Sequence, residues 1–351
     1  MGKPMSTVIK ERMLSAAQTL GTANPLPYVE PLINQSFALP AGDAKYAANT
    51  LTPGAVPFEP SFSEQEPHIL RFVIEPCGPG VLPVSRRDEA TREMRRLVGP
   101  FFGRDALRWF DQRSEEWRGF SSHARLDYGA WFGTAYDQDG LAASKIYYEL
   151  QPQQIAALPP ELAHLVRTTL DAMPALLPIF TSIACRRDSG NQRVTFLHRG
   201  SLRLADLGPL LSRLGLNHQL PSIMQVVGLC LGGRFDLPER AVLLGLGMAG
   251  DGPEIKLEVL LGMLPDVPPM FLDLLTLGLA ERPRQLHALG RWLRAFTPES
   301  YDWPGEFSVL SIRATPRTPA RVSLYLRPAD FEVRRRLSDL SRIRPLEGAL
   351  P

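Results

Sequence analysis

The sequence predicts an α+β fold, a closed antiparallel β-barrel of about ten strands inside a ring of α-helices. Helical segments and pairs of strand-like segments alternate about four times along the chain. Turn-forming residues separate the strands of a pair, as in Asp188-Ser189-Gly190-Asn191 and Ala249-Gly250-Asp251-Gly252-Pro253. Helix pairs between such hairpins are not βαβ units, so the sheet should be antiparallel, and regular repetition lets it close. The alternative is two α+β domains divided near residue 175.

The elements follow from apolar spacing and from breaker residues. Ile9, Met13 and Ala17 recur at helical spacing, whereas residues 21–60 are rich in Pro, Gly and Asn and are expected to form a loop. Pro76 ends the first expected strand. Strands are expected at 68–75, 122–134, 143–150, 179–186, 192–198, 240–248, 254–261, 306–314 and 320–327. Helices are expected at 6–20, from Ser85 or Asp88 to 99, and at 105–118, 158–173, 204–215, 219–231, 268–279, 283–296 and 329–341.

Composition limits the class of protein. The 351 residues, 44% hydrophobic and 22% charged, suit one large globular domain over 1–351, with residues 1 to about 55 as a helix-and-loop extension. A net charge of +2 is nearly balanced and does not indicate a nucleic-acid-binding protein. Cys77, Cys185 and Cys230 lie far apart without a CxxC motif, which argues against disulfides and zinc. Without a signal peptide or a long apolar span, we expect a cytoplasmic protein that is not bound to membranes, a monomer or homodimer.

The segment Ser144-Lys145-Ile146-Tyr147-Tyr148-Glu149-Leu150 has an unusual strand pattern. Alternation places Lys145, Tyr147 and Glu149 on one face, and the other face is mostly apolar. If the first face lines an enclosed space, the ammonium of Lys145 needs an anion. That anion could be Glu149, another carboxylate on a neighbouring strand, or a ligand.

Four stretches match, in order and spacing, motifs of one enzyme family. They are Val56-Pro57-Phe58-Glu59-Pro60-Ser61-Phe62-Ser63, Arg71-Phe72-Val73-Ile74-Glu75-Pro76, Lys145-Ile146-Tyr147, and Arg321-Val322-Ser323-Leu324-Tyr325-Leu326. The chain therefore resembles the αββα-barrel (ABBA) aromatic prenyltransferases, particularly the dimethylallyltryptophan-synthase group. The resemblance implies that Glu59 faces the aromatic substrate, that Arg71 meets the diphosphate, and that the Tyr325 strand closes the barrel.

The sequence also departs from the family pattern. The family expects Arg-x-Lys-x-Tyr in the third hairpin, and here Arg193 is followed by Thr195 and Leu197. In the next hairpin Glu258 stands where a Tyr is expected after Lys256. The basic residue expected before Lys-x-Tyr has no match in Ala130-Trp131-Phe132-Gly133.

A barrel would bring together four cations from different strands, Arg71, Lys145, Arg193 and Lys256, and these repel one another unless an anion binds. A prenyl diphosphate is such an anion. Since no DDxxD-like cluster occurs, we expect metal-independent ionisation, and no cofactor. Arg71 could instead pair with Glu75, and Lys256 with Glu254 or Glu258.

The remaining site residues would handle the allylic cation. Tyr147, Tyr325 and Tyr128 could shield it with their ring faces, and Glu59 could accept an indole N–H or a proton. Together with these residues, the resemblance implies transfer of a dimethylallyl or geranyl group to an electron-rich aromatic acceptor derived from indole or tryptophan. The alternatives are a non-catalytic barrel that binds a hydrophobic or phosphorylated ligand, and a prenyltransferase for phenols or peptides.

Overall fold

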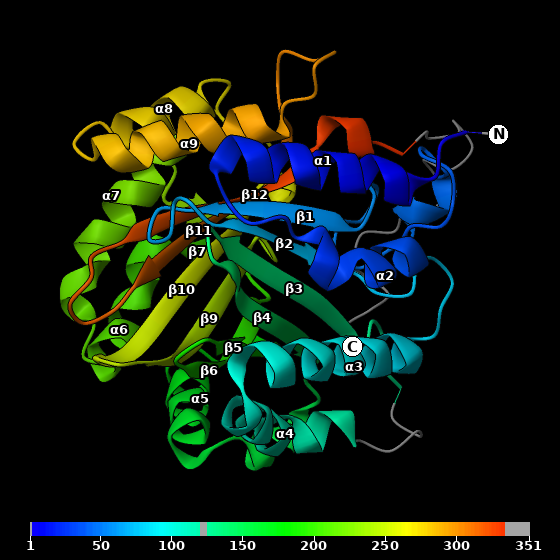
Figure 1. Cartoon of the computed structure of the whole chain (residues 1–351). Helices are drawn as coiled ribbons and strands as arrows, with labels where there is room; N and C mark the ends of the chain where they lie inside the picture. The colour runs from blue at the N-terminus through cyan, green and yellow to red at the C-terminus, as the bar shows by residue number, and fades with distance from the viewer. Residues whose placement is uncertain (1, 120–124, 334–351) are drawn as a thin grey trace.

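In the computed structural model, which describes residues 2–119 and 125–333, ten strands form one closed antiparallel barrel (Figure 1). Their order is β1-β12-β11-β10-β9-β6-β5-β4-β3-β2, and pairing of Ser61 with Tyr325 closes the ring. The strands are β1 (Phe58–Ser63), β2 (Leu70–Ile74), β3 (Ala130–Asp137), β4 (Gly140–Glu149), β5 (Leu176–Arg186), β6 (Gly190–His198), β9 (Val242–Ala249), β10 (Gly252–Leu260), β11 (Gly305–Ala314) and β12 (Arg321–Pro328). The predicted barrel is confirmed, and the two-domain alternative is wrong.

The helices form a layer outside the barrel (Figure 1). They are α1 (Met5–Leu20), α2 (Leu26–Ser36), α3 (Pro83–Phe102), α4 (Arg104–Arg118), α5 (Pro160–Ala172), α6 (Gly208–Arg213), α7 (Leu220–Cys230), α8 (Phe271–Gly278) and α9 (Pro283–Phe296). In the view of Figure 1, α1, α8 and α9 lie above the strands and α3 and α4 below them. The short strands β7 (Leu202–Arg203) and β8 (Asp236–Leu237) pair outside the barrel.

The core lies between the strands and the helices. On β4, Ile146 and Tyr148 point outward and are fully buried, and the Tyr148 hydroxyl lies 2.8 Å from Thr91 Oγ1 of α3. On β2, Phe72 is likewise buried and stacks on Phe58, with ring centroids 5.0 Å apart. The apolar face of each strand is thus used for helix packing, which leaves the other face for the lumen.

One expectation for the N-terminal part is wrong. Residues 21–60 are not a continuous loop, because they contain α2, a 3₁₀ turn at Ala44–Ala47 and the start of β1. The prolines at 25 and 27 lie at the N-terminal end of α2, where a missing N–H costs nothing, although Pro31 lies within the helix. The expected helix at 329–341 begins as a 3₁₀ turn at Ala329–Phe331, and residues 334–341 lie outside the described residues.

All five hairpin turns lie at one end of the barrel, which we call the hairpin end. The helical connections lie at the other end, which we call the connection end. This arrangement follows from the antiparallel order of the strands. In the described residues, the three cysteines are free, and no helix has the length and apolar character needed to cross a membrane.

Candidate functional site

The lumen holds a cavity of about 190 Å³ that reaches the hairpin end. Alternation along each strand selects the residues that line it. Small side chains keep it open, since Gly133, Ala135, Ala143 and Ala184 occupy neighbouring lumen positions. The charged residues and tyrosines that line it are Glu66, Arg71, Lys145, Tyr147, Arg186, Arg193, Lys256, Arg313 and Tyr325. All four predicted diphosphate-binding residues and two of the three predicted shielding tyrosines therefore line the cavity.

Lys145 is the cation of this group that lacks a carboxylate partner among the described residues. Glu149 cannot serve, because its carboxylate accepts hydrogen bonds from the backbone N–H groups of Asp127, Tyr128 and Gly129 at 2.9 to 3.1 Å. The Lys145 ammonium instead lies over the Tyr147 ring, 4.2 Å from its centroid. Enclosure in the lumen, together with the nearby charges of Arg193 and Lys256, holds the pKa of Lys145 well below its usual value.

Two arginine–glutamate–arginine groups line the same cavity as Lys145 or pair with residues that line it. Glu66 binds Arg71 at 3.1 Å and Arg186 at 2.5 Å. Burial alone would raise the pKa of Glu66, but the two guanidinium groups outweigh it and the pKa is lowered. Each such group keeps one net positive charge, so the mouth of the cavity attracts anions.

The second arginine–glutamate–arginine group lies deeper in the lumen. Glu254 is fully buried and binds both Arg193 and Arg313, and these charges lower its pKa against the effect of burial. Gly245 makes room for this arrangement, since a Cβ there would lie 3.0 Å from Arg193 Cδ and 3.3 Å from Lys256 Cβ. Arg193 is thus partly neutralised, which its sequence motif did not predict.

Lys256 is an ion-pair partner as well as a cavity residue. Its Nζ donates to Glu258 at 2.6 Å and to the Tyr325 hydroxyl at 2.7 Å. Glu258 stands where the family pattern has a Tyr, and it fixes the direction of Lys256. The local ion pair expected as an alternative is therefore present with Glu258, while Arg71 pairs with Glu66 and not with Glu75.

Glu59 lies beyond the floor of the cavity and does not line it. Its carboxylate accepts a hydrogen bond from Ser308 Oγ at 2.6 Å. Burial raises the pKa of Glu59 to about 7, although the Ser308 hydrogen bond and the charges of Arg327 and Lys256 oppose this shift. A carboxyl group with this pKa can exchange a proton near neutral pH.

Tyr128 also lies away from the cavity. Its ring stacks on Trp131 with centroids 4.4 Å apart, and its hydroxyl donates to the Ile179 carbonyl at 3.1 Å. Its position gives the predicted shielding role no support. Among the described residues, no group of three or more His, Cys, Asp or Glu side chains could hold a metal ion.

The cavity contains two cations that the sequence reasoning missed, Arg186 and Arg313. Both lie on expected strands and share a face with small lumen residues, so strand alternation alone could have found them. They were passed over because no family motif covers them. Their partners are Glu66, in the turn between β1 and β2, and Glu254 on β10, and sequence spacing cannot pair residues so far apart.

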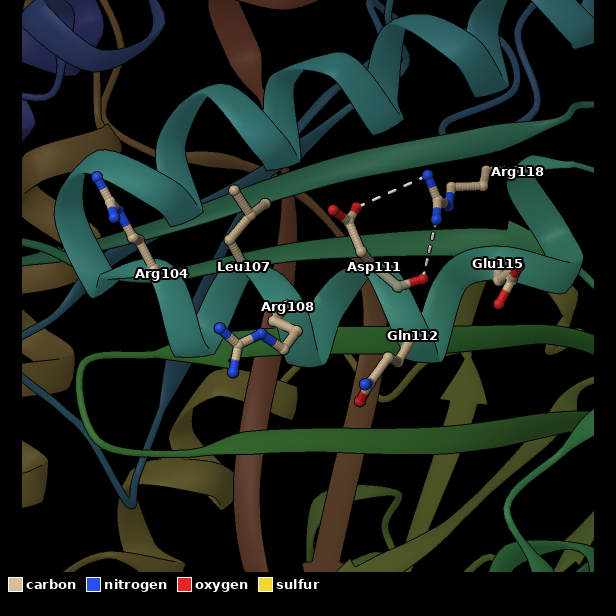
Figure 2. Close-up of a pocket in the computed structure, with 7 residues that line it drawn as sticks. All are labelled: Arg104, Leu107, Arg108, Asp111, Gln112, Glu115 and Arg118. Atoms are coloured by element: carbon tan, nitrogen blue, oxygen red, sulfur yellow. Dashed lines mark hydrogen bonds and ion pairs between the residues drawn. The ribbon is translucent and has the colours of Figure 1, made fainter.

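A second, open groove of about 320 Å³ runs along α4 on the outer surface (Figure 2). Several charges along it pair with one another, since Asp111 lies 3.1 Å from Arg95 and 3.8 Å from Arg118, and Arg108 lies 3.4 Å from Asp105. The barrel cavity, with cations in excess, is therefore the candidate site.

The fold matches solved prenyltransferase structures along almost the whole chain. A 6-dimethylallyl tryptophan synthase aligns with a TM-score of 0.72 and 16% identity over 96% of this chain and 100% of that one. The 5-dimethylallyltryptophan synthase from Streptomyces coelicolor aligns with a TM-score of 0.66 and 15% identity over 95% and 100%. AnaPT from Neosartorya fischeri aligns with a TM-score of 0.58 and 13% identity over 88% and 87%.

These matches confirm the predicted resemblance at the level of the fold. No protein-family model matches the sequence, and no curated protein does. At such low identity the likeness carries the architecture, and the chemistry has to be argued from the residues of this chain.

Proposed function

We propose that this protein transfers a prenyl group from a prenyl diphosphate to an electron-rich aromatic acceptor derived from indole or tryptophan, without a metal ion. The observation that carries the proposal is Lys145, an enclosed ammonium without a carboxylate partner among the described residues, at the centre of a lumen with excess positive charge. Proteins with this fold have been solved with dimethylallyl thiolodiphosphate and L-tryptophan.

In this proposal the diphosphate lies between Lys145 and the two arginine–glutamate–arginine groups. Lys145 supplies a point charge, whereas Arg71 and Arg193 keep N–H groups for phosphate oxygens beyond those used by their carboxylates. Lys256 contributes less, because Glu258 and Tyr325 already take its donors. The cations neutralise the charge that develops on the diphosphate as it leaves.

The reaction then proceeds through three bond changes. The C–O bond of the donor breaks, and its electron pair leaves with the diphosphate. An aromatic carbon of the acceptor forms the new C–C bond to the allylic cation, and the arenium intermediate loses a proton to restore aromaticity. Tyr147 and Tyr325 line the cavity at the place where the cation forms, and ring faces stabilise a cation by about 0.5–2 kcal/mol.

We assign Glu59 as the group that receives this proton. Its pKa of about 7 suits a proton acceptor near neutral pH. It lies on β1 in register with Val73, a residue of the cavity wall, so it is next to the cavity although it does not line it.

The test is turnover in EDTA. Dimethylallyl diphosphate is incubated with tryptophan, indoles, phenols and indole-containing peptides, and diphosphate release and product mass are measured. We expect a prenylated indole product, and we expect Lys145→Ala to lose most of the activity while Lys45→Ala, an exposed lysine, keeps it. Absence of product across the panel, with a folded protein, would contradict transferase function.

A second candidate is a barrel that binds a prenyl diphosphate without transferring the prenyl group. The size of the cavity favours it, since about 190 Å³ is smaller than the roughly 300–1,000 Å³ of usual ligand sites. The separation of Glu59 from the cavity favours it too. Tight binding of a donor analogue without product in any acceptor assay would select this candidate.

A further inference from the structure

The connection end of the lumen is filled by aromatic rings. Trp131 lies 6.3 Å from Tyr147 and 5.7 Å from Phe180, measured between ring centroids, and Tyr128 stacks on its other side at 4.4 Å. Phe180 also meets Tyr147 edge to face at 5.7 Å. Only Tyr147 of these four rings borders the cavity. This cluster therefore limits how far the cavity extends toward the connection end.

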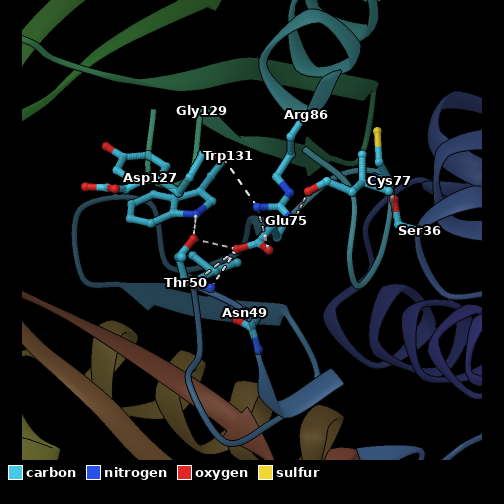
Figure 3. Close-up of polar contacts among 12 residues, drawn as sticks. Ser36, Asn49, Thr50, Glu75, Cys77, Arg86, Asp127, Gly129 and Trp131 are labelled. Carbon is cyan, nitrogen blue, oxygen red and sulfur yellow. Dashed lines mark hydrogen bonds and ion pairs between the residues drawn. The ribbon is translucent and has the colours of Figure 1, made fainter. Parts of the chain in front are cut away.

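A chain of polar contacts holds Trp131 in place (Figure 3). The indole N–H donates to Thr50 Oγ1 at 3.0 Å, and the Thr50 hydroxyl donates to Glu75 at 2.6 Å. Glu75 also accepts from the backbone N–H groups of Thr50 and Leu51, and it lies 3.1 Å from the Arg86 guanidinium. Glu75 and Arg86 are both buried. Residues from before β1, from β3, from the end of β2 and from α3 are thereby joined, so the indole has little freedom to turn.

The register places this indole one step beyond the diphosphate site. Gly133 is the cross-strand partner of Lys145, and Trp131 is the partner of Tyr147. Two residues along a strand span about 6.8 Å. A prenyl chain whose diphosphate lies at Lys145 and whose tail runs inward past Tyr147 therefore reaches Trp131 after about 6.8 Å. A dimethylallyl group ends before this point, whereas the second isoprene unit of a geranyl group would occupy the space of the indole.

We propose that Trp131, fixed by Thr50, restricts the donor to the dimethylallyl group. This inference rests on the proposed function, because it presumes that a prenyl diphosphate binds at Lys145. It adds a specificity-determining residue at a position where the strand before Lys-x-Tyr has no family basic residue. Thr50 is a positioning residue that acts through the indole.

The test is calorimetric binding of dimethylallyl and geranyl thiolodiphosphate, which reports donor fit without turnover. Wild-type protein should bind the dimethylallyl analogue at least about tenfold more tightly, the value of one to two well-buried methylene groups. Trp131→Ala should reverse this preference, and Trp131→Phe should reduce it. Thr50→Val, which keeps the indole and removes its hydrogen bond, should reduce the preference roughly threefold.

Matched controls exist for both kinds of substitution. Trp117→Phe makes the same change in a buried tryptophan on α4, outside the barrel. Thr52→Val removes a hydroxyl from the same N-terminal segment, where it donates to the Val56 carbonyl and not to Glu75. Neither control should change the ratio of the two affinities. If Trp131→Ala does not fold, the ratio of the two affinities in Trp131→Phe and in Thr50→Val tests the role of Trp131.

The possible outcomes separate this inference from the proposed function. An unchanged ratio in Trp131→Phe and Thr50→Val, with binding retained, overturns the role of Trp131 alone. Equal affinity of the wild-type protein for the two analogues would also overturn the role of Trp131 alone. Failure of the wild-type protein to bind either analogue overturns the proposed function, and the donor restriction with it.

Discussion

The two ends of the lumen are built from the same alternating strands but hold opposite chemistry. The hairpin end carries small residues and more cations than carboxylates, so Lys145 is left without a carboxylate partner among the described residues. The connection end carries stacked rings and a buried carboxylate, Glu75, which pairs with Arg86 and accepts hydrogen bonds from the backbone N–H and hydroxyl of Thr50. The hairpin end therefore has a cation that can bind an anion from solution, whereas Glu75 and Arg86 at the connection end bind each other. This difference identifies the ligand end of the barrel.

If the connection end is structural, Glu75→Gln should destabilise the fold by about 3–5 kcal/mol, because it leaves the buried Arg86 charge without a carboxylate. The measurement is urea unfolding. Asp105→Asn is the control, since Asp105 pairs with Arg108 on the surface, where both side chains are exposed. Equal unfolding midpoints for the two variants would contradict a structural role for this end.

Glu59, a buried carboxyl group that does not line the cavity, should make stability depend on pH. Its pKa rises from 4.5 to about 7 in the folded protein, so the folded state holds the proton more tightly. The stabilisation is fully present below about pH 4.5, and about 3 kcal/mol is lost as the pH rises through about 7. Urea unfolding at pH 5 and pH 8 measures the loss. Glu59→Gln should remove this fall, and parallel pH dependence of the two proteins would show that Glu59 is not the titrating group.

Substitution of a charged residue at the mouth of the cavity should have the smallest effect of the three, a modest loss of donor affinity. Arg186 is partly exposed and shares Glu66 with Arg71, so Arg186→Ala should weaken binding of dimethylallyl thiolodiphosphate roughly three- to fivefold. High salt should reduce this difference, because exposed charges are screened. Arg187→Ala is the matched control, since Arg187 is the next residue but pairs with Asp137. An equal loss in both variants would mean that general surface charge, and not the cavity mouth, attracts the donor.

Much of the fold could be predicted because its signals are local. Turn residues marked the hairpins, and alternation placed Lys145 and Tyr147 on the lumen face of β4. The strand β1 was missed because Pro60 and its neighbours are typical of loops, although Pro60 is paired with Phe72 in the sheet. In that case long-range pairing outweighed local preference.

The site could be predicted only in part. Its cations were expected to meet in the lumen, and they do. The pairing of Glu66 with Arg186 was not predicted, because the two residues lie 120 positions apart in the sequence. No local pattern connects the Trp131 indole with Thr50, which lies 81 positions away. Contacts of this kind depend on closure of the barrel.

The central claim is that Lys145 at the hairpin end is kept for a diphosphate. The most direct test compares Lys145→Met with the wild-type protein in EDTA, by calorimetry with dimethylallyl thiolodiphosphate and by urea unfolding. We predict affinity at least about 100-fold weaker, the loss of a charge-assisted contact, with stability equal to or above that of the wild type. Unchanged affinity, or a loss of stability like that of Glu75→Gln, would contradict the claim.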